Sequence, residues 1–213
     1  EHLSGTGKLK SLRQLKQRPT TIYLVLPASR LDSHARWLRV ILSLALAALE
    51  REPMKLAAPV LFILEEFPAL GYMRQIEKAA GLMAGYGVKL WYIFQDLTQL
   101  KSLYRDSWET FLGNAGFVQS FANTDATTLE YISRGLGDLP LVDLKPTNIT
   151  ASGAMSGGMT TRIETRNAPL LAPFEVALYT SRESGRQIVR LAGRPPAYLE
   201  RITHQEVKNL GKI

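Results

Sequence analysis

The chain has 213 residues, of which 46% are hydrophobic, so it can bury a sizeable core, and an intrinsically disordered chain is excluded. Its formal net charge of +7 favours anionic partners such as nucleotides, nucleic acid or a membrane surface. The absence of cysteine excludes disulfides, thiolate zinc sites and cysteine nucleophiles, and the three histidines lie too far apart in sequence to suggest a metal site. We expect no transmembrane segment and no signal peptide.

Residues 1–19 are polar and basic, and we interpret them as a linker or arm. They contain Gly7 and Lys8, a pair that resembles a fragment of a phosphate-binding loop. That loop needs a glycine five residues before Gly7, where His2 stands, and a serine or threonine after the lysine, where Leu9 stands. We therefore predict that this chain contains no phosphate loop.

A β-branched and apolar run at residues 20–26 predicts a buried strand that Pro27 stops. Asp32 or Ser33 is then expected to cap a helix that runs to about Glu50. This helix is apolar nearly all round from Val40 onward, so we expect it to be mostly buried.

Five apolar residues at 60–64 lead directly into two carboxylates, Glu65 and Glu66. An unbroken apolar run of this length is typical of a strand buried on both faces of a parallel sheet, and open α/β sheets bind ligands at the carboxyl ends of their strands. In a nucleotide hydrolase, one carboxylate at this place holds the Mg²⁺ shell and a second orients the attacking water. The alternative is a core strand that ends in two solvated acids.

The next helix is predicted from apolar residues at three- and four-residue steps between Leu70 and Met83, and it ends near residues 85–87. A second apolar strand, residues 88–94, follows and delivers Gln95. If the two strands are neighbours, Gln95 lies at the same edge as the carboxylates, where its amide can contact a terminal phosphate or the attacking water. The alternative for Gln95 is a polar residue that caps a turn.

Helices are predicted at residues 98–104 and 107–112, a strand at 116–122, and a helix from the capping residue Asp125 to about Leu136. This alternation of strands and helices favours parallel βαβ units. Residues 147–161 are rich in threonine, serine and glycine, which indicates a flexible loop or an irregular hairpin. A short helix after Pro173 precedes two strands, residues 187–191 and 197–202, which we expect to pair antiparallel at a sheet edge.

Positive charge gathers in residues 8–18 and in residues 162–201, which contain seven arginines. No pattern for base readout accompanies this charge, so we identify no individual DNA-binding residue. We expect weak, sequence-independent DNA binding through phosphate contacts, with an ordinary solvated basic surface as the alternative.

Taken together, several segments resemble the VirD4/TraG family of type IV secretion coupling proteins, which are conjugation ATPases. Their order along the chain is that of the family, from about residue 20 to residue 202. The matching segments are residues 61–71, 84–90, 95–100, 104, 114, 121, 123, 125–128, 132–137, 169–171 and 193–196.

The resemblance implies an α/β fold, the C-terminal part of a RecA-like P-loop NTPase core with a mostly parallel sheet, flanking helices and a short antiparallel edge. It implies ATP and Mg²⁺ as cofactors, with Glu65 on the metal, Glu66 activating water and Gln95 sensing phosphate. It also implies a homo-hexamer at the cytoplasmic face of the bacterial inner membrane. There it would move DNA with its relaxase, or effector proteins, to other subunits of the secretion system.

On this basis residues 20–146 are the C-terminal half of the nucleotide-binding domain, 147–168 a flexible loop or hairpin, and 169–213 the edge strands and tail of the same domain. The family usually has aspartate where Glu65 stands, and a carboxylate displaced by one methylene weakens catalysis unless the backbone adjusts.

We expect the chain to be the C-terminal portion of a longer ATPase, and to be inactive alone because the phosphate loop is absent. The alternative is a non-catalytic module for docking DNA or protein, or a related hexameric DNA pump outside secretion.

Overall fold

The computed structural model describes residues 11–17, 19–52, 58–147, 160–203 and 206–207. The chain divides into two compact units, Glu1–Val118 and Gln119–Ile213. The predicted linker motif at Gly7 and Lys8 and most of the loop at residues 147–161 lie outside the described residues.

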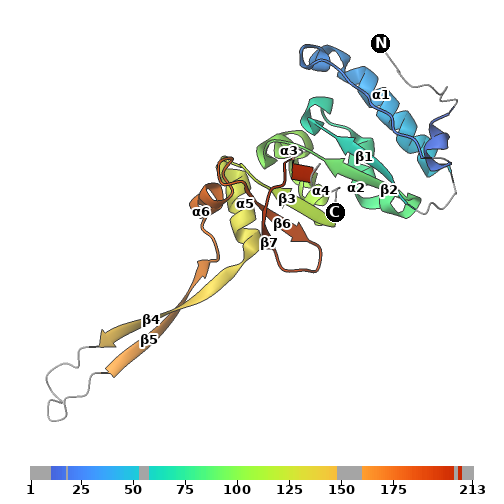
Figure 1. The fold of residues 1–213 in the computed structure, drawn as a ribbon. Coiled ribbons are helices and arrows are strands. Elements are labelled where there is room, and N and C mark those ends of the chain that lie inside the picture. Colours follow the sequence, from blue (N-terminus) through green and yellow to red (C-terminus); the bar gives the residue numbers. More distant parts are fainter. Residues whose placement is uncertain (1–10, 18, 53–57, 148–159, 204–205, 208–213) are drawn as a thin grey trace, which may run out of the picture. The chain divides into compact units, whose positions relative to one another are not determined.

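The first unit contains a two-stranded parallel sheet flanked by helices (Figure 1). Its helices and strands are α1 (Leu31–Glu50), β1 (Val60–Leu64), α2 (Arg74–Leu82), β2 (Val88–Tyr92), α3 (Leu97–Tyr104) and α4 (Glu109–Gly113). Its 3₁₀ helices are η1 (Leu12–Lys16), η2 (Ala28–Arg30), η3 (Phe67–Leu70), η4 (Met83–Tyr86) and η5 (Arg105–Ser107).

Strands β1 and β2 pair in parallel, with Val60 opposite Val88 and Leu64 opposite Tyr92, and α2 lies between them in sequence. This confirms the predicted βαβ unit. The predicted capping residue Asp125 is also confirmed, because it accepts a hydrogen bond from the backbone of Thr128, and Asp96 caps α3 in the same way through the backbone of Gln99. Met73 and Met83 are buried, as expected of core methionines.

The second unit contains two helices, α5 (Ala126–Leu136) and α6 (Pro173–Tyr179), whose buried side chains meet those of β6 (Arg186–Leu191) in one small core. Strand β6 lies between β3 (Phe117–Ser120), which spans the boundary of the two units, and β7 (Ala197–Glu200). The predicted antiparallel pairing of the last two strands is confirmed.

A long antiparallel hairpin of β4 (Asp138–Thr147) and β5 (Thr160–Pro169) also belongs to this unit. These two strands were not predicted. A flexible loop or an irregular hairpin was expected at residues 147–161, whereas the paired strands reach back to Asp138 and forward to Pro169. The prolines at positions 140, 146 and 169 hide the pattern in the sequence, although a two-stranded hairpin accommodates proline because each strand has an unpaired edge.

The predicted strand at residues 20–26 is wrong, because this segment has no regular secondary structure and Tyr23 and Val25 are largely exposed. The expected cap of α1 at Asp32 or Ser33 is also wrong: the cap position is Arg30, and Ser33 donates a hydrogen bond to the Arg30 carbonyl instead. Helix α1 is buried on one side only, since Trp37, Val40 and Leu44 are about half exposed.

The expectation that β1 is buried on both faces is wrong in this chain, where Leu61 is 50% and Ile63 is 54% exposed. On β2, Trp91 lies directly opposite Ile63 and is also exposed. One face of the parallel pair is therefore packed on the core of the first unit, while the other carries uncovered apolar side chains.

Candidate functional site

The polar residues that the sequence singled out follow the two parallel strands at one edge. Glu65 and Glu66 come directly after β1, and Gln95 comes three residues after the end of β2. Backbone hydrogen bonds continue beyond the ladder: Ile93 donates to the Leu64 carbonyl at 3.0 Å, and Phe67 donates to the Ile93 carbonyl at 3.0 Å. The carboxyl ends of β1 and β2 are thus held side by side, which brings the three residues to the same edge of the sheet.

Glu66 adopts a left-handed backbone conformation, with φ 46° and ψ 44°. For a residue with a Cβ this conformation costs roughly 1–2 kcal/mol, and such conformations cluster at active sites and ligand clamps. The turn also aims the following residue inward, because Phe67 is completely buried while Glu65 and Glu66 are both exposed. The chain turns at Glu66, and the burial of Phe67 holds it in place one residue later.

The anchor is a cluster of aromatic rings around Phe67. Its ring centroid lies 4.9 Å from Tyr92 and 5.8 Å from both Tyr104 and Phe111, and Tyr104 and Phe111 meet edge to face at 4.5 Å. Burial raises the pKa of Tyr104 to about 12, so this phenol stays neutral at physiological pH. The cluster joins β2, α3 and α4 beneath the turn and fixes where Glu66 leaves the fold.

Gln95 is held by the start of α3. Its backbone N–H donates to the side-chain oxygen of Gln99 at 3.3 Å, and Asp96 caps the helix through the Gln99 backbone at 2.9 Å. The Thr98 hydroxyl also donates to the Asp96 carboxylate. Gln95 is exposed at the start of α3.

Two exposed carboxylates and an amide make an oxygen-rich edge, which suits Mg²⁺. Among the described residues, no group of three or more His, Cys, Asp or Glu side chains is placed to hold a metal ion. This donor set fits Mg²⁺ in its usual protein setting, where one or two carboxylates bind it together with substrate phosphates and water. It does not provide an all-protein metal cage.

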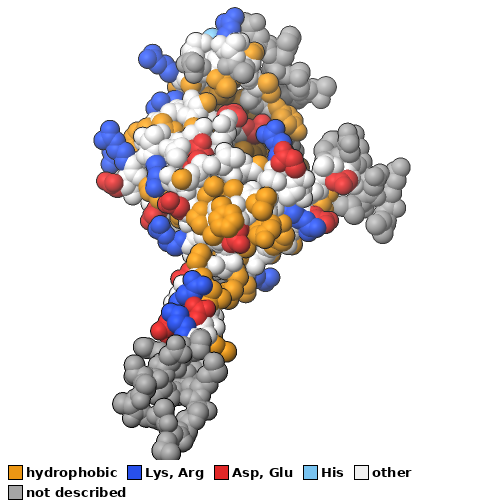
Figure 2. Space-filling view, turned by 90° about the vertical axis from the view of Figure 1, so that its left-hand side faces the viewer, with side chains coloured by type: hydrophobic (Ala, Val, Ile, Leu, Met, Phe, Trp, Pro, Cys, Tyr) orange, Lys and Arg blue, Asp and Glu red, His pale blue; other side chains and the backbone are white. Residues whose placement is uncertain are grey.

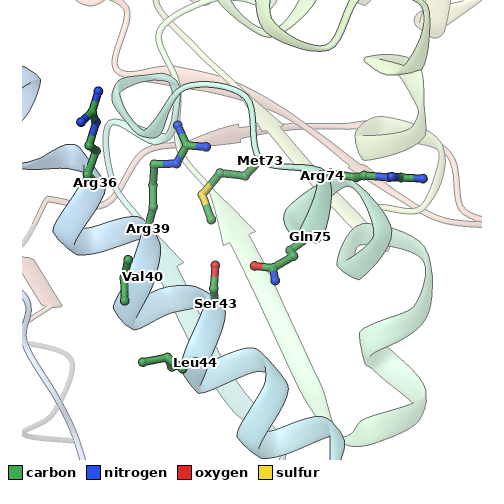
Figure 3. A pocket seen from close by; sticks show the side chains of 8 residues that line it. All are labelled: Arg36, Arg39, Val40, Ser43, Leu44, Met73, Arg74 and Gln75. Carbon is green, nitrogen blue, oxygen red and sulfur yellow. The ribbon is translucent and has the colours of Figure 1, made fainter.

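Sequence reasoning missed a basic cavity between α1 and the start of α2, with a volume of about 630 Å³. Figure 3 shows Ser43 and Gln75 pointing toward one another across it. Arg39 donates to the Tyr72 carbonyl at 3.0 Å and ties α1 to the turn before α2. Arg36 and Arg74 also line the cavity. The spacing of Arg36, Val40 and Leu44 at four-residue steps is the one sequence signal for this surface.

Much of the predicted basic charge is engaged within the fold. Lys16 is buried and donates to the carbonyls of Leu49 and Glu52, both at 2.8 Å, so it closes the C-terminus of α1 rather than facing a ligand. In the second unit, Arg166 forms an ion pair with Asp143, and Arg186 forms one with Glu200. Arg190 lies over the ring of Tyr131, and Arg201 lies over the ring of Phe121.

Comparison with known proteins identifies the family of the chain. The family model described as type IV secretory system conjugative DNA transfer matches residues 10–210. VirD4 of Agrobacterium fabrum is 30% identical over 206 residues, which is 95% of this chain and 30% of that protein. The conjugal transfer protein TraG of the same organism is 32% identical over 194 residues, 90% of this chain and 29% of that protein. The chain thus spans less than a third of the length of these curated relatives.

Solved structures show the same fold. The unbound bacterial conjugative coupling protein TrwBΔN70 superimposes with a TM-score of 0.71 at 15% identity, covering 90% of this chain and 43% of that one. TrwB in complex with ADP and Mg²⁺ gives a TM-score of 0.68 at 15% identity, covering 89% and 42%. The predicted α/β RecA-like fold is confirmed by this likeness, with a larger antiparallel part than expected.

Among the described residues, no helix is both long enough and apolar enough to cross a membrane. The family match covers nearly the whole chain and agrees with the resemblance drawn from its motifs. The chain belongs to the type IV secretory system conjugative DNA transfer family, that of the VirD4/TraG coupling proteins.

Proposed function

We propose that the chain is the C-terminal part of an ATP-driven coupling protein that brings DNA–relaxase complexes or effector proteins to a secretion channel. The observation that carries the proposal is the parallel pairing of β1 and β2, which gathers Glu65, Glu66 and Gln95 at one edge. The complexes of TrwB with ADP and Mg²⁺ and with a non-hydrolysable ATP analogue support nucleotide and Mg²⁺ as the ligands of this edge.

In this proposal each residue has a separate role. Glu65 holds Mg²⁺, which neutralises charge on the phosphates when bound. Glu66 accepts a proton from the attacking water and orients it, a role that its exposed carboxylate on a rigid turn permits. Gln95 contacts the terminal phosphate through its amide. The phosphate loop comes from a part of the motor outside the segments that carry these residues.

The assembly and its location are part of the same proposal. We infer a homo-hexamer at the cytoplasmic face of the bacterial inner membrane, which holds DNA without regard to sequence and contacts relaxase, effector and channel subunits. A motor that moves any sequence needs phosphate contacts rather than base readout.

The test is Glu66→Gln in the complete parent protein. Loss of the general base is expected to lower ATP turnover by roughly 10²-fold or more while nucleotide binding stays near wild type, because Glu66 acts on the chemical step. Phosphate release and binding of a fluorescent nucleotide measure the two effects. Glu65→Asp, which restores the commoner side-chain length, is expected to keep or raise turnover.

Glu109→Gln on the exposed surface of α4 is the matched control and should leave turnover unchanged. If Glu66→Gln hydrolyses ATP like the wild type, the assignment of this edge is wrong. A parent protein that binds DNA but hydrolyses no ATP would instead favour the non-catalytic docking module.

A further inference from the structure

The basic cavity between α1 and the start of α2 differs in charge from the surface around it. Figure 2 shows basic and acidic side chains intermixed over one face of the molecule, and on the β4–β5 hairpin Lys145 pairs with Glu164 at 2.6 Å. The cavity is lined by Arg36, Arg39 and Arg74, and none of the described residues that line it is acidic. Among the described side chains, no carboxylate forms an ion pair with these arginines. An anionic group can therefore reach them without displacing a carboxylate.

Two of the arginines lie at one end of the cavity. Figure 3 shows the guanidinium groups of Arg36 and Arg39 near the chain that leads into α2, whereas Arg74 points away from the cavity. Arg39 donates one hydrogen bond to the Tyr72 carbonyl at 3.0 Å, which leaves other N–H groups of its guanidinium for a ligand. Glu77, the one acid of α2, accepts a hydrogen bond from the Tyr72 hydroxyl at 2.9 Å. The Arg36–Arg39 end suits a phosphate, whose oxygens an arginine contacts with two N–H groups at once.

Further along α1, the cavity has an uncharged polar pair, Ser43 and Gln75, which face each other across it (Figure 3). Within the described part of the chain, neither the Ser43 hydroxyl nor the Gln75 amide has a hydrogen-bond partner. A helical serine often donates to a carbonyl of the preceding turn, as Ser102 does to Gln99 at 2.8 Å. Because a hydroxyl and an amide both donate and accept, this pair can bind the polar edge of an uncharged ring.

The walls between the two ends are apolar. Met73 is only 5% exposed, and Figure 3 shows its thioether between the Arg39 guanidinium and Ser43. Val40 and Leu44 line the cavity from α1. A thioether packs well on an aromatic ring. The volume of about 630 Å³ lies within the range of about 300–1,000 Å³ that is usual for small-molecule sites.

We propose that this cavity binds a nucleotide, with the phosphate at Arg36 and Arg39 and the edge of the base at Ser43 and Gln75. A nucleotide presents an anion, a sugar and a flat ring with a polar edge in this order, and the base packs beside Met73. An acidic peptide supplies the anion but not a ring edge that both donates and accepts. A free nucleotide and an unpaired DNA strand carry the same unit, so the experiment has to separate these two sources.

The site is distinct from the proposed catalytic edge, because Glu65, Glu66 and Gln95 do not line the cavity. Binding is therefore measured on the 213-residue chain in EDTA, since the catalytic edge is proposed to hold its nucleotide through Mg²⁺. Calorimetric titrations compare AMP with ribose 5-phosphate, which has the same sugar and phosphate but no base. We expect one AMP per chain and about tenfold tighter binding of AMP than of ribose 5-phosphate, because the base adds apolar and hydrogen-bond contacts.

Two sets of variants separate the ends of the cavity. A chain with both Ser43→Ala and Gln75→Ala is expected to bind AMP about 3–10-fold more weakly and ribose 5-phosphate as the wild type does. Arg36→Ala should weaken both ligands by about tenfold, because it removes a charge-assisted contact to the phosphate. Arg51→Ala, at the opposite end of α1, is the matched control with the same change of charge and should leave both affinities unchanged.

Equal affinities for AMP and ribose 5-phosphate would overturn the proposal. So would a loss in Arg51→Ala as large as that in Arg36→Ala, which would mean general attraction to a basic surface. A glutamate-rich peptide that displaces AMP, and that binds more weakly when Ser43 and Gln75 are both replaced by alanine, would identify an acidic peptide as the occupant instead.

The source of the nucleotide is read from a competition. A fluorescein-labelled single-stranded oligonucleotide is bound to the chain and titrated with AMP. Displacement that is lost when Ser43 and Gln75 are both replaced by alanine would show that the cavity takes a nucleotide of a DNA strand. An oligonucleotide that AMP leaves in place, together with AMP binding as expected, would identify a free nucleotide as the ligand. Neither result depends on ATP turnover in Glu66→Gln, so this proposal and the proposed function can fail separately.

Discussion

At the scale of single residues, Glu66 combines an exposed carboxylate with a left-handed backbone. The conformation is maintained because both neighbouring elements are fixed: β1 by its ladder with β2, and Phe67 by burial and a backbone hydrogen bond to Ile93. The backbone strain at Glu66 therefore lies at the residue that is the candidate catalytic base.

Replacing Glu66 by glycine should relieve this strain. Glu66→Gly is expected to leave the free energy of unfolding unchanged or raise it by up to about 1 kcal/mol, although it deletes the proposed base. Glu66→Val, with a β-branched side chain in the same backbone, should lower it by roughly 1–2 kcal/mol. Urea unfolding of the 213-residue chain measures both. A glycine variant less stable than the valine variant would refute the left-handed turn.

Lys16 offers a second test at this scale. Its ammonium makes two hydrogen bonds to carbonyls at the end of α1, so Lys16→Ala should lower the free energy of unfolding by roughly 2–3 kcal/mol. Arg13→Ala, an exposed basic residue of the same 3₁₀ helix, is the control and should change it by less than about 0.5 kcal/mol. Equal effects of the two substitutions would mean that the Lys16 contacts contribute nothing.

At the scale of elements, the aromatic cluster connects the turn after β1 with α3 and α4. Phe67→Ala should lower the free energy of unfolding by about 3–5 kcal/mol, the usual loss for a fully buried phenylalanine. Phe117→Ala, at a half-exposed position, is the control and should lose much less. Thermal or urea unfolding decides, and a small loss for Phe67→Ala would show that the turn does not depend on its anchor.

The helices and strands also show which features of the fold can be predicted from the sequence. Asp125 was identified as a cap because a local signal, a short acidic side chain before a helical pattern, is sufficient to form a cap. Residues 20–26 have a strand composition but no regular structure, because a strand needs a partner and the sequence of one segment does not say where the partner lies. An irregular hairpin was one alternative for residues 147–161, but strands β4 and β5 were not predicted, because their prolines weaken the strand pattern and only pairing between the strands overcomes this.

For the candidate site, the sequence predicted which residues end the two strands, and the register confirmed that those strands are neighbours. The left-handed turn at Glu66 was not predicted, because it is imposed by the burial of Phe67 and the hydrogen bond to Ile93, both of which depend on packing distant in sequence. The buried Lys16 was likewise interpreted as surface charge, because nothing local to residues 8–18 reveals the carbonyls at the end of α1.

At the scale of the whole molecule, part of the +7 net charge is engaged within the fold, in the part of the chain that the structure describes. Lys16 is buried, Arg166 and Arg186 are paired with carboxylates, and the arginines that line the cavity of the first unit are Arg36, Arg39 and Arg74. Arg39 is engaged with a backbone carbonyl, which makes Arg36 and Arg74 the better candidates for phosphate contacts.

We expect the chain to bind DNA weakly, without sequence preference and with a strong salt dependence. Replacing both Arg36 and Arg74 by alanine should reduce the slope of log affinity against log salt by up to about 2. Arg166→Ala, which removes a residue already paired with Asp143, is the control. Fluorescence anisotropy with two unrelated duplexes at several salt concentrations measures the slopes. No binding at low salt would leave the charge as ordinary solvated surface.

One arrangement within the first unit has a mechanical consequence. Helix α3 begins one residue after Asp96, beside Gln95, and ends at Tyr104, whose ring stacks on Phe67, the residue that follows Glu66. An eight-residue helix is a stiff rod about 12 Å long, capped at one end and stacked at the other. A push on the Gln95 end must either shift Tyr104 against Phe67 or bend the rod. Gln95 and Glu66 are therefore mechanically coupled through α3 and the ring of Tyr104, in addition to lying at the same edge of the sheet.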